Sequence, residues 1–393
     1  MTAGWRESTL GEVCTLLNGR AYTKQELLEG GKYPVLRVGN FFTNTHWYYS
    51  DLELAEDKYC DRDDLLYAWS ASFGPRIWTG PKAIFHYHIW KVVPNADLID
   101  KGFLHHFFLW DADLIKAEQG TGTTMLHVSK GSMEARGISL PTLEEQRRIV
   151  AILDEAFEGI ATAKAHAEQN LRNAMEVFVQ QREAVLAGDM SWAEAELSSL
   201  CEIKHGYAFE GEHFSTQGEH VLLTPGSFHE AGGFRERGDK TKYFTGHIPS
   251  AYVLDEGDLL VAMTEQAAGL LGSPLLVPES GRFLHNQRLG RVIAKSDVPW
   301  LNEFFFHAFN LRRVRKAIHD SGSGAKVRHT SPGKIGAVRV RYPQSIVEQQ
   351  AIADGLVELN AECQRLVGIY QRKLTALTEL QQSLLHQAFT GKL

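Results

Sequence analysis

The sequence has few cysteines and no long apolar run. Its four cysteines, Cys14, Cys60, Cys201 and Cys363, lie far apart and form no Cys-x-x-Cys pair, which argues against a zinc site and against a disulfide framework. No apolar stretch approaches the roughly 20 residues that span a bilayer, and the N-terminus has no apolar signal core. We therefore expect a cytoplasmic protein that makes no contact with a membrane.

Motifs of two enzyme classes are also missing. No Pro-Pro pair occurs in the chain, so the Asn/Asp-Pro-Pro-aromatic loop of a methyltransferase that acts on the amino group of a flipped base is absent. The segment 322–326 lacks the Gly-x4-Gly-Lys-Ser/Thr spacing that cradles nucleotide phosphates. The histidines His86, His88, His105 and His106 have no matching acid or cysteine cluster, so we interpret them as half-buried structural residues rather than metal ligands.

Positive charge is scarce overall but concentrated locally. The net charge of the 393 residues is −7, which is unfavourable for a protein that would bind nucleic acid alone. The segment 312–341 nevertheless holds nine basic residues and one acid, Asp320. This segment fits either a groove-facing basic edge or a solvated helix face followed by a basic strand.

The strongest signal is an internal repeat. The opening of the chain returns 187 positions later as a second copy with the same spacing of Trp, Leu, Cys, Gly, Ala and an aromatic residue. Later matches follow in the same order with drifting insertions, which indicates a duplication rather than chance. The paired segments are Trp5–Tyr22 with Trp192–Phe209, Leu36–Phe41 with Leu223–Phe228, Asp64–Leu66 with Asp258–Leu260, Gly120–Ser129 with Gly322–Ser331, and Leu140–Gln146 with Tyr342–Gln349.

The repeat also weakens one catalytic interpretation. Glu202-Ile203-Lys204 partly resembles the acid and lysine of a nuclease, but the first copy has Thr15-Leu16-Leu17 at the same place. We therefore expect no catalytic residues in this chain.

Each copy begins with about 140 residues of short apolar alternations and turn residues. Segments such as 33–38 and 83–90 are typical of strands in a mixed β domain. One helix is expected to interrupt the strands in each copy, over 104–110 in the first and over 301–318 in the second.

A long helix is expected to follow each of these domains. From Glu144 to Ala187 the chain has no proline and a single glycine, Gly159. A Pro followed by Glu-Gln precedes each helix, and Gly188 and Gly391 stand just beyond the two ends. Apolar or small residues recur in heptads, which predicts that the helices pack as a coiled coil. The expected core positions are Ile149, Ala156, Ala163, Asn170, Val177, Leu153, Ile160, Ala167, Ala174 and Gln181, then Ile352, Leu359, Leu366, Lys373, Leu380, Leu356, Cys363, Tyr370, Leu377 and Leu384.

These features together resemble the specificity subunits of Type I restriction–modification systems. The residues that carry the resemblance are the two Trp-x4-Leu openings, the two Pro…Glu-Gln helix starts and the C-terminal segment Leu385–Leu393. The resemblance covers essentially the whole chain, but Arg182–Gly188 stands where the second copy has Leu385–Gly391. This departure leaves the docking contacts at the end of the first helix open.

The resemblance implies an α+β fold of two mixed α/β target-recognition domains in tandem, separated by two long helices packed as an antiparallel coiled coil. The implied boundaries are 1–143 for the first domain, 144–188 for the first spacer helix, 189–344 for the second domain and 345–393 for the second spacer helix. Each domain would read one half of an asymmetric target in double-stranded DNA, for defence against phage. The partners would be two methylation subunits, which bind S-adenosylmethionine, and restriction subunits, which use ATP and Mg²⁺; this chain would bind no cofactor.

Base edges are read mainly by polar side chains on exposed loops. In the first domain we expect three such loops, which hold Thr43, Asn44, His46, Ser70, Ser72, Arg76, Gly120, Thr121, Gly122 and Thr123. In the second domain the expected DNA-binding residues are Arg235, Arg237, Lys240, Lys242, Thr264, Gln266, Asn286, Gln287, Arg288, Ser323, Gly324, Lys326 and Arg328. Trp5 and Trp192 open both copies identically, so we assign them to the cores.

A second function class remains open at this point. A duplicated β-rich domain on a coiled coil is also typical of a non-catalytic scaffold that binds other proteins. The basic segment 312–341 favours DNA over this alternative.

Overall fold

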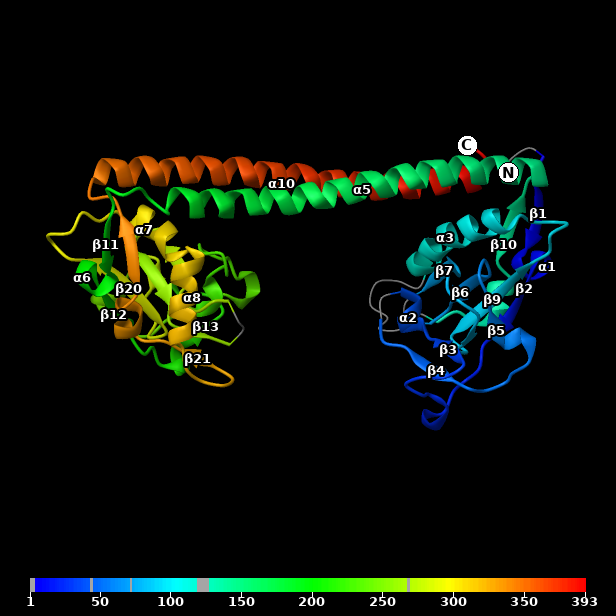
Figure 1. Ribbon diagram of the computed structural model, residues 1–393, viewed down its shortest axis with the longest axis horizontal. Helices are drawn as coiled ribbons and strands as arrows, with labels where there is room; N and C mark the ends of the chain where they lie inside the picture. Colours follow the sequence, from blue (N-terminus) through cyan, green and yellow to red (C-terminus); the bar gives the residue numbers. More distant parts are fainter. Residues whose placement is uncertain (1–3, 43–44, 71–72, 119–126, 267–268) are drawn as a thin grey trace. The chain divides into compact units, whose positions relative to one another are not determined.

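A computed structural model describes residues 4–42, 45–70, 73–118, 127–266 and 269–393. The chain divides into two compact units. The first unit comprises Met1–Glu168 with Gln371–Leu393, and the second unit comprises Gln169–Tyr370. Each unit therefore contains a mixed α/β domain and a part of both long helices (Figure 1).

The first unit contains two four-stranded sheets and a two-stranded sheet, with the orders β2-β9-β6-β7, β4-β3-β8-β5 and β1-β10. Within these sheets β3 and β8 pair in parallel, and the other strand pairs are antiparallel. The strands are β1 (Arg6–Thr9), β2 (Cys14–Asn18), β3 (Tyr33–Leu36), β4 (Tyr48–Ser50), β5 (Tyr59–Cys60), β6 (Leu65–Ala68), β7 (Gly74–Ile77), β8 (Ala83–Phe85), β9 (Ile89–Pro94) and β10 (Gly137–Leu140).

The second unit repeats two of these sheets, as β12-β20-β16-β18 and β11-β22, and adds the ribbon β17-β21. In its other sheet, β13-β15-β14-β19, the strands β15-β14-β19 correspond to β4-β3-β8, but β13 is an extra edge strand and no strand in the described residues corresponds to β5. Here too one pair, β14 with β19, is parallel. The strands are β11 (Ala193–Glu196), β12 (Cys201–His205), β13 (Phe214–Ser215), β14 (His220–Leu222), β15 (Tyr243–Phe244), β16 (Leu259–Ala262), β17 (Thr264–Glu265), β18 (Pro274–Leu276), β19 (Phe283–Leu284), β20 (Leu289–Ala294), β21 (Arg328–His329) and β22 (Arg339–Tyr342). The shared strand order supports the duplication inferred from the sequence.

The helices inside the two domains differ from expectation. The helix expected over 104–110 is longer, α3 (Lys101–Glu118), and the single helix expected over 301–318 is two helices, α7 (Asn302–Phe309) and α8 (Arg312–Ser321). The break falls at Asn310 and Leu311, where the backbone of Leu311 is extended. The shorter helices are α1 (Leu10–Val13), α2 (Val38–Phe42), α4 (Lys130–Glu134), α6 (Leu197–Leu200) and α9 (Pro332–Gly336).

The two long helices, α5 (Leu143–Val185) and α10 (Ile346–Phe389), run antiparallel to each other within each unit. In the first unit Arg148 Nη2 donates to the Leu393 carbonyl at 2.9 Å and Lys164 Nζ donates to Gln381 Oε1 at 3.1 Å. In the second unit Gln181 lines one cavity with Ile352 and Leu356. The expected α+β fold with paired long helices is therefore confirmed.

The expected heptad core is only partly right. Four successive expected positions of α5 are buried, namely Leu153, Ile160, Ala167 and Ala174. In α10, Leu356 and Cys363 are also buried. Five other expected core positions are exposed to solvent: Asn170, Val177, Gln181, Lys373 and Leu380. An α-helix drifts relative to a strict seven-residue repeat, and the buried face of α5 therefore moves to Arg182 and Leu186 near its end.

The ends of both long helices pack into the domain cores. In the first unit Phe389 of α10 contacts the rings of Phe103 and Phe107 of α3, with centroids 5.1 and 5.5 Å apart. In the second unit Leu186 belongs to the same buried cluster as Trp192 and Phe304. Trp192 is buried as expected, whereas Trp5 is half-buried and packs on the core from its edge.

A buried glutamine ties the start of each long helix to its domain. Both Gln146 and Gln349 are fully buried. The amide of Gln146 donates to the carbonyls of Leu98 and Pro141 at 3.0 Å and accepts from the Asp100 N–H at 2.7 Å. The amide of Gln349 makes the same three bonds, at 2.9–3.0 Å, with the backbones of Pro299, Pro343 and Leu301. The glutamine of each Glu-Gln helix start, Gln146 or Gln349, therefore anchors the long helix to its domain by three hydrogen bonds, and we call this contact the glutamine clasp.

None of the helices in the described residues is both long and apolar enough to cross a membrane.

The glutamine clasp predicts a large loss of stability when the amide is removed. We expect Gln349→Leu to lower the free energy of unfolding by about 2–4 kcal/mol, because it leaves three buried backbone groups without partners. The matched control is Gln350→Leu, which removes an exposed amide that bonds Asp354 and should cost under about 0.5 kcal/mol. Urea denaturation followed by circular dichroism measures both. Equal losses for the two variants would contradict the clasp.

Candidate nucleic-acid interface

In the second unit three of the expected DNA-reading loops are joined by backbone hydrogen bonds. The Met263 N–H donates to the Arg288 carbonyl at 3.0 Å, and the Thr330 N–H donates to the Met263 carbonyl at 3.0 Å. Strand β17 pairs with β21, and Ser323 and His329 exchange two backbone bonds at 2.9 Å. The segments 263–266, 286–288 and 323–330 therefore form one continuous edge, which we call the second edge.

The first unit has an equivalent edge. The Trp69 N–H donates to the His88 carbonyl at 3.1 Å, the Val128 N–H donates to the Trp69 carbonyl at 3.4 Å, and Ser70 bridges His127. These bonds match those of Met263, Arg288 and Thr330 one for one. We call the segments 69–70, 86–88 and 127–128 the first edge.

A glycine, Gly19 or Gly206, lies against the turn in the middle of each edge. The residue that follows each glycine donates its backbone N–H to that turn: Arg20 to the Phe85 carbonyl at 3.0 Å, and Tyr207 to the His285 carbonyl at 2.9 Å. A Cβ on Gly206 would lie 2.3 Å from the carbonyl oxygens of His285 and Asn286, and a Cβ on Gly19 would lie 2.4 Å from the equivalent oxygens. Only glycine fits there, which accounts for its place in both sequence repeats.

The second edge presents mainly amide and cationic side chains. Gln266, Gln287, Arg288, Ser323 and Lys326 are exposed. Among the described residues, the side chains of Gln287, Arg288 and Lys326 make no hydrogen bond or ion pair within the chain. Such groups have the donors and acceptors that base edges and phosphates require.

Other residues expected to face DNA on the second edge instead shape it from within. Thr264 is buried and its Oγ1 lies 3.2 Å from His329 Nδ1. Asn286 is buried, and its Oδ1 accepts from the Arg288 N–H at 3.0 Å. Gly324 adopts a φ of +112°, and a Cβ there would lie 2.1 Å from the Val327 carbonyl.

The Arg328 side chain also makes its contacts within the fold. Its guanidinium bonds the His319 carbonyl at 2.7 Å and pairs at 3.5 Å with Glu265, which is buried. Glu265 in turn accepts three backbone N–H bonds from Gly269, Leu270 and Leu271 at 2.9–3.1 Å. Arg328 therefore fixes the loop that follows β17 rather than extending from the edge.

The first edge presents aromatic rings and imidazoles, which sequence reasoning missed. The Trp69 ring lies 5.0 Å from His88, 6.2 Å from Tyr87 and 6.0 Å from His127. Tyr87 is 39% exposed, and the Trp69 Nε1–H donates to the Tyr87 carbonyl at 2.9 Å. The expected strand over 83–90 hid this turn, because the structure breaks that segment into β8 and β9 with residues 86–88 between them.

Two imidazoles of this edge, those of His86 and His88, have a pKa below the usual value. Burial lowers the pKa of His86 to about 4, with smaller effects from His88 and Arg37. Burial also lowers the pKa of His88, with His127 as the second cause. A neutral imidazole offers one donor and one acceptor, so both can address a base edge without adding charge.

The remaining sites expected in the first domain are scattered. Thr43, Asn44, Ser72 and Gly120–Thr123 lie outside the described residues. Ser70 is buried in the first edge. His46 is exposed, with its ring 4.9 Å from Tyr48. Arg76 is on β7, with its guanidinium hydrogen-bonded to the Phe41 carbonyl and 5.9 Å from the Phe41 ring.

The basic residues expected on the loop 229–242 surround a pocket of 470 Å³ in the second unit. Arg237, Lys240 and Lys242 line it together with Arg282, and Glu236 and Glu279 reduce its charge. Arg237 donates to the Gly226 carbonyl at 2.7 Å, and Lys242 lies 5.4 Å from the Phe214 ring. Arg235 is exposed, and its backbone bonds Ser227.

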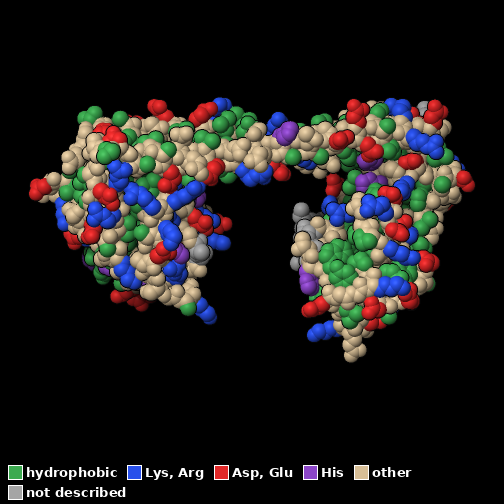
Figure 2. Space-filling view, viewed as in Figure 1, with side chains coloured by type: hydrophobic (Ala, Val, Ile, Leu, Met, Phe, Trp, Pro, Cys, Tyr) green, Lys and Arg blue, Asp and Glu red, His purple; other side chains and the backbone are tan. Residues whose placement is uncertain are grey.

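Most of the basic side chains in the segment 312–341 make contacts within the second unit. Seven of its nine cations bond or pair within the second unit: Arg312, Arg315, Lys316, Arg328, Lys334, Arg339 and Arg341. Only Arg313 and Lys326 make no such contact with the described residues. Most of these cations therefore already have partners within the fold. Figure 2 likewise shows Lys and Arg intermixed with Asp and Glu on the visible face.

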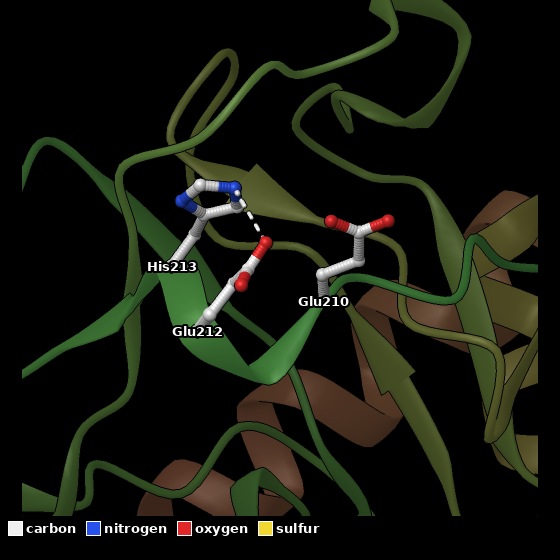
Figure 3. A group of neighbouring side chains, drawn as sticks. All are labelled: Glu210, Glu212 and His213. Carbon is white, nitrogen blue, oxygen red and sulfur yellow. Dashed lines mark ion pairs between the residues drawn. The ribbon is translucent and has the colours of Figure 1, made fainter.

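One cluster in the described part of the chain has the composition of a metal site. Glu210, Glu212 and His213 lie together on a surface turn, with His213 Nε2 3.6 Å from Glu212 Oε1 (Figure 3). All three side chains are exposed, and the His213 ring packs 5.8 Å from Phe244. Proximity in sequence alone accounts for this cluster, so we assign no metal to it.

The chain is similar to known proteins in both sequence and fold. Residues 2–171 match the family described as the Type I restriction modification DNA specificity domain. The EcoKI specificity subunit of Escherichia coli K12 is 23% identical, over 99% of this chain and 89% of that protein. The EcoBI specificity subunit of Escherichia coli is 25% identical over 47% of this chain, and the match spans only 38% of that protein.

Two solved structures share the fold over the whole chain at 17% identity. The HsdS subunit from Thermoanaerobacter tengcongensis superposes with a TM-score of 0.57 and is covered to 98%. A chain from a structure of complex assembly and conformational transition in the type I R-M system superposes with a TM-score of 0.78 and is covered to 99%.

Residues 2–171 therefore match a DNA-specificity domain, and the chain has the fold of a duplicated domain with paired long helices. Over most of its length the chain is similar to Type I restriction enzyme specificity subunits.

The close approach at Gly206 predicts that a single methyl group disturbs the second edge. We expect Gly206→Ala to lower the free energy of unfolding by about 1–3 kcal/mol, because the turn 286–288 must move to admit the Cβ. In the control Gly211→Ala the new Cβ meets only Phe214, at 3.9 Å. Urea denaturation compares the two variants, and indistinguishable midpoints would show that the turn does not depend on this glycine.

Proposed function

We propose that this chain reads a bipartite, asymmetric sequence in double-stranded DNA, with one edge addressing each half, and that it performs no reaction itself. The observation that carries the proposal is the pair of equivalent edges. Their backbones match bond for bond, while their side chains differ: half-buried Trp69 and His88 with exposed Tyr87 on one, and exposed Gln266, Gln287 and Arg288 on the other. Equal scaffolds with unequal side chains are what two different half-sites require.

The two edges suit two different kinds of contact. Arg288 can bond guanine O6 and N7 as a fork, and glutamine can bond adenine N6 and N7. The rings of Tyr87 and Trp69 instead offer apolar surface, which suits a thymine methyl group, and neutral His88 offers a donor and an acceptor. The two half-sites should therefore differ in base composition.

The chain's charge supports a role for partner proteins in binding. A net charge of −7 and a basic segment absorbed by internal contacts leave few cations to neutralise phosphates, so DNA binding by the chain alone should be weak. We infer that two methylation subunits, with their S-adenosylmethionine, supply the backbone contacts and the reaction. Restriction subunits that use ATP and Mg²⁺ would join them. The similar chain from an assembled type I R-M system supports this inference.

Arg288 tests the assignment of the second edge. With methylation subunits present, we expect Arg288→Ala to weaken binding to the target by about 1–3 kcal/mol and to relax the sequence of one half only. Selection from a random duplex pool measures both effects. The control Arg365→Ala removes an exposed cation of α10 that pairs with Glu362 at 2.6 Å, and it should change neither half. Relaxation of both halves, or of none, would contradict the assignment.

The long helices predict the length of the gap between the half-sites. We expect deletion of seven residues from each of α5 and α10 to shorten that gap by about three base pairs, because seven helical residues span about 10 Å. Seven residues are close to two turns, so the apolar face is kept. Methylation-site sequencing would report the new gap. Altered half-sequences with an unchanged gap would refute the spacer role.

A further inference from the structure

The second unit buries an arginine that has no acidic partner. Arg182 of α5 is 6% exposed. Its Nη2 donates to the Asn310 carbonyl at 3.0 Å, and its Nε has no hydrogen-bond partner among the described residues. The guanidinium lies 5.5 Å from the Phe178 ring and forms no ion pair with any described carboxylate. Its neighbour Glu183 is engaged elsewhere, by the Arg312 N–H at 2.7 Å.

The surroundings of Arg182 are also polar and incompletely satisfied. His307 Nδ1 and Asn310 Nδ2 are buried without hydrogen-bond partners in the described structure. A second guanidinium, that of Arg315, donates to Asn310 Oδ1 at 3.3 Å. Burial lowers the pKa of Arg315 to about 10, and Arg182 is the second cause. Burial likewise lowers the pKa of His307 to about 4, again with Arg182 as the second cause.

Of these groups, Arg182 and His307 line a pocket of the second unit. The pocket measures 780 Å³ and is lined by Arg182, Arg235 and His307 on its polar side. Its apolar wall is formed by Met175, Phe178, Val179, Phe306 and Val367. Met175 is 51% exposed, so the apolar wall reaches the surface.

The duplication shows that the fold does not need a cation here. The residue of the first unit that corresponds to Arg182 is Leu385, which is buried among apolar side chains. The glutamine clasps align Leu301 with Asp100, and Asn310 therefore corresponds to Leu109, which packs on the same core. The matching pocket of the first unit, lined by Leu109 and Leu385, measures only 240 Å³. A buried arginine in place of Leu385 and a larger cavity thus distinguish the second unit.

We propose that this pocket receives an acidic side chain, flanked by apolar residues, from a partner protein. A buried cation without a counter-charge is costly, and a carboxylate that enters the pocket offsets that cost with charge-assisted hydrogen bonds to Arg182 Nε. The apolar wall favours a protein segment over a DNA phosphate, which has no apolar flank to bury against Phe178 and Val179. Two arginines, Arg182 and Arg235, and one acid, Glu230, line the pocket, so it remains cationic.

The test replaces Arg182 by the residue of its repeat partner. We expect Arg182→Leu to weaken binding of the full chain to a purified methylation subunit by about tenfold or more, measured by calorimetry. It should leave the melting temperature unchanged or higher, because an unpaired buried cation is replaced by an apolar side chain. Arg182→Lys keeps the charge and should bind better than Arg182→Leu. The control Arg172→Leu changes an exposed residue of α5 that bonds Gln169 at 2.8 Å and should bind as the native chain does.

Three outcomes would overturn the proposal: native binding by Arg182→Leu, a lowered melting temperature alongside weaker binding, or a loss of DNA affinity in the chain alone. The second would make Arg182 structural, and the third would make the pocket a phosphate site. The choice of a methylation subunit as the probe rests on the proposed function. The two ideas fail separately, because an assembled complex with no sequence preference refutes DNA reading while leaving the Arg182 result intact.

Discussion

The buried amide of a glutamine at the start of each long helix is the contact on which the rest of the structure depends. Gln146 and Gln349 each satisfy two backbone carbonyls and one N–H that would otherwise be buried without partners. The bonded backbone belongs to the strand ends and to the segment that enters α3 or α7, so one side chain fixes the helix, the sheet and the internal helix in a single geometry. Because the same clasp occurs in both copies, both domains present their edges on the same scaffold.

The sequence was sufficient to predict the duplication, the two long helices and the place where each begins. These features follow from local rules: the spacing of apolar residues, the absence of proline and the position of glycine. The heptad core was predicted less well, since an α-helix does not keep a strict seven-residue repeat, and Val177 and Leu380 are exposed as a result. The break between α7 and α8 was missed because Phe309–Val314 keeps an apolar pattern through the extended residue Leu311.

The structure buries or pairs several side chains that the sequence analysis expected to face DNA, and these differences have a common cause. A sequence shows which residues are charged, but not which charges the fold uses. Arg328 and Arg315 look like DNA-binding cations, yet both bond backbone carbonyls of the second unit, and Arg328 also pairs with the buried carboxylate of Glu265. The turn 86–88 was read as strand because its aromatic and histidine residues have high strand propensity. It could be recognised only from the hydrogen bonds of Gly19 and Trp69, which show that it is the equivalent of 286–288 in the second unit.

We propose that the two unlike edges on matching scaffolds read two unlike half-sites. Methylome sequencing of cells that express the native chain with methylation subunits decides whether they do. The expected result is one modified motif made of two short, different sequences separated by a fixed unspecified gap. A symmetric motif, a continuous motif or no motif at all would contradict it.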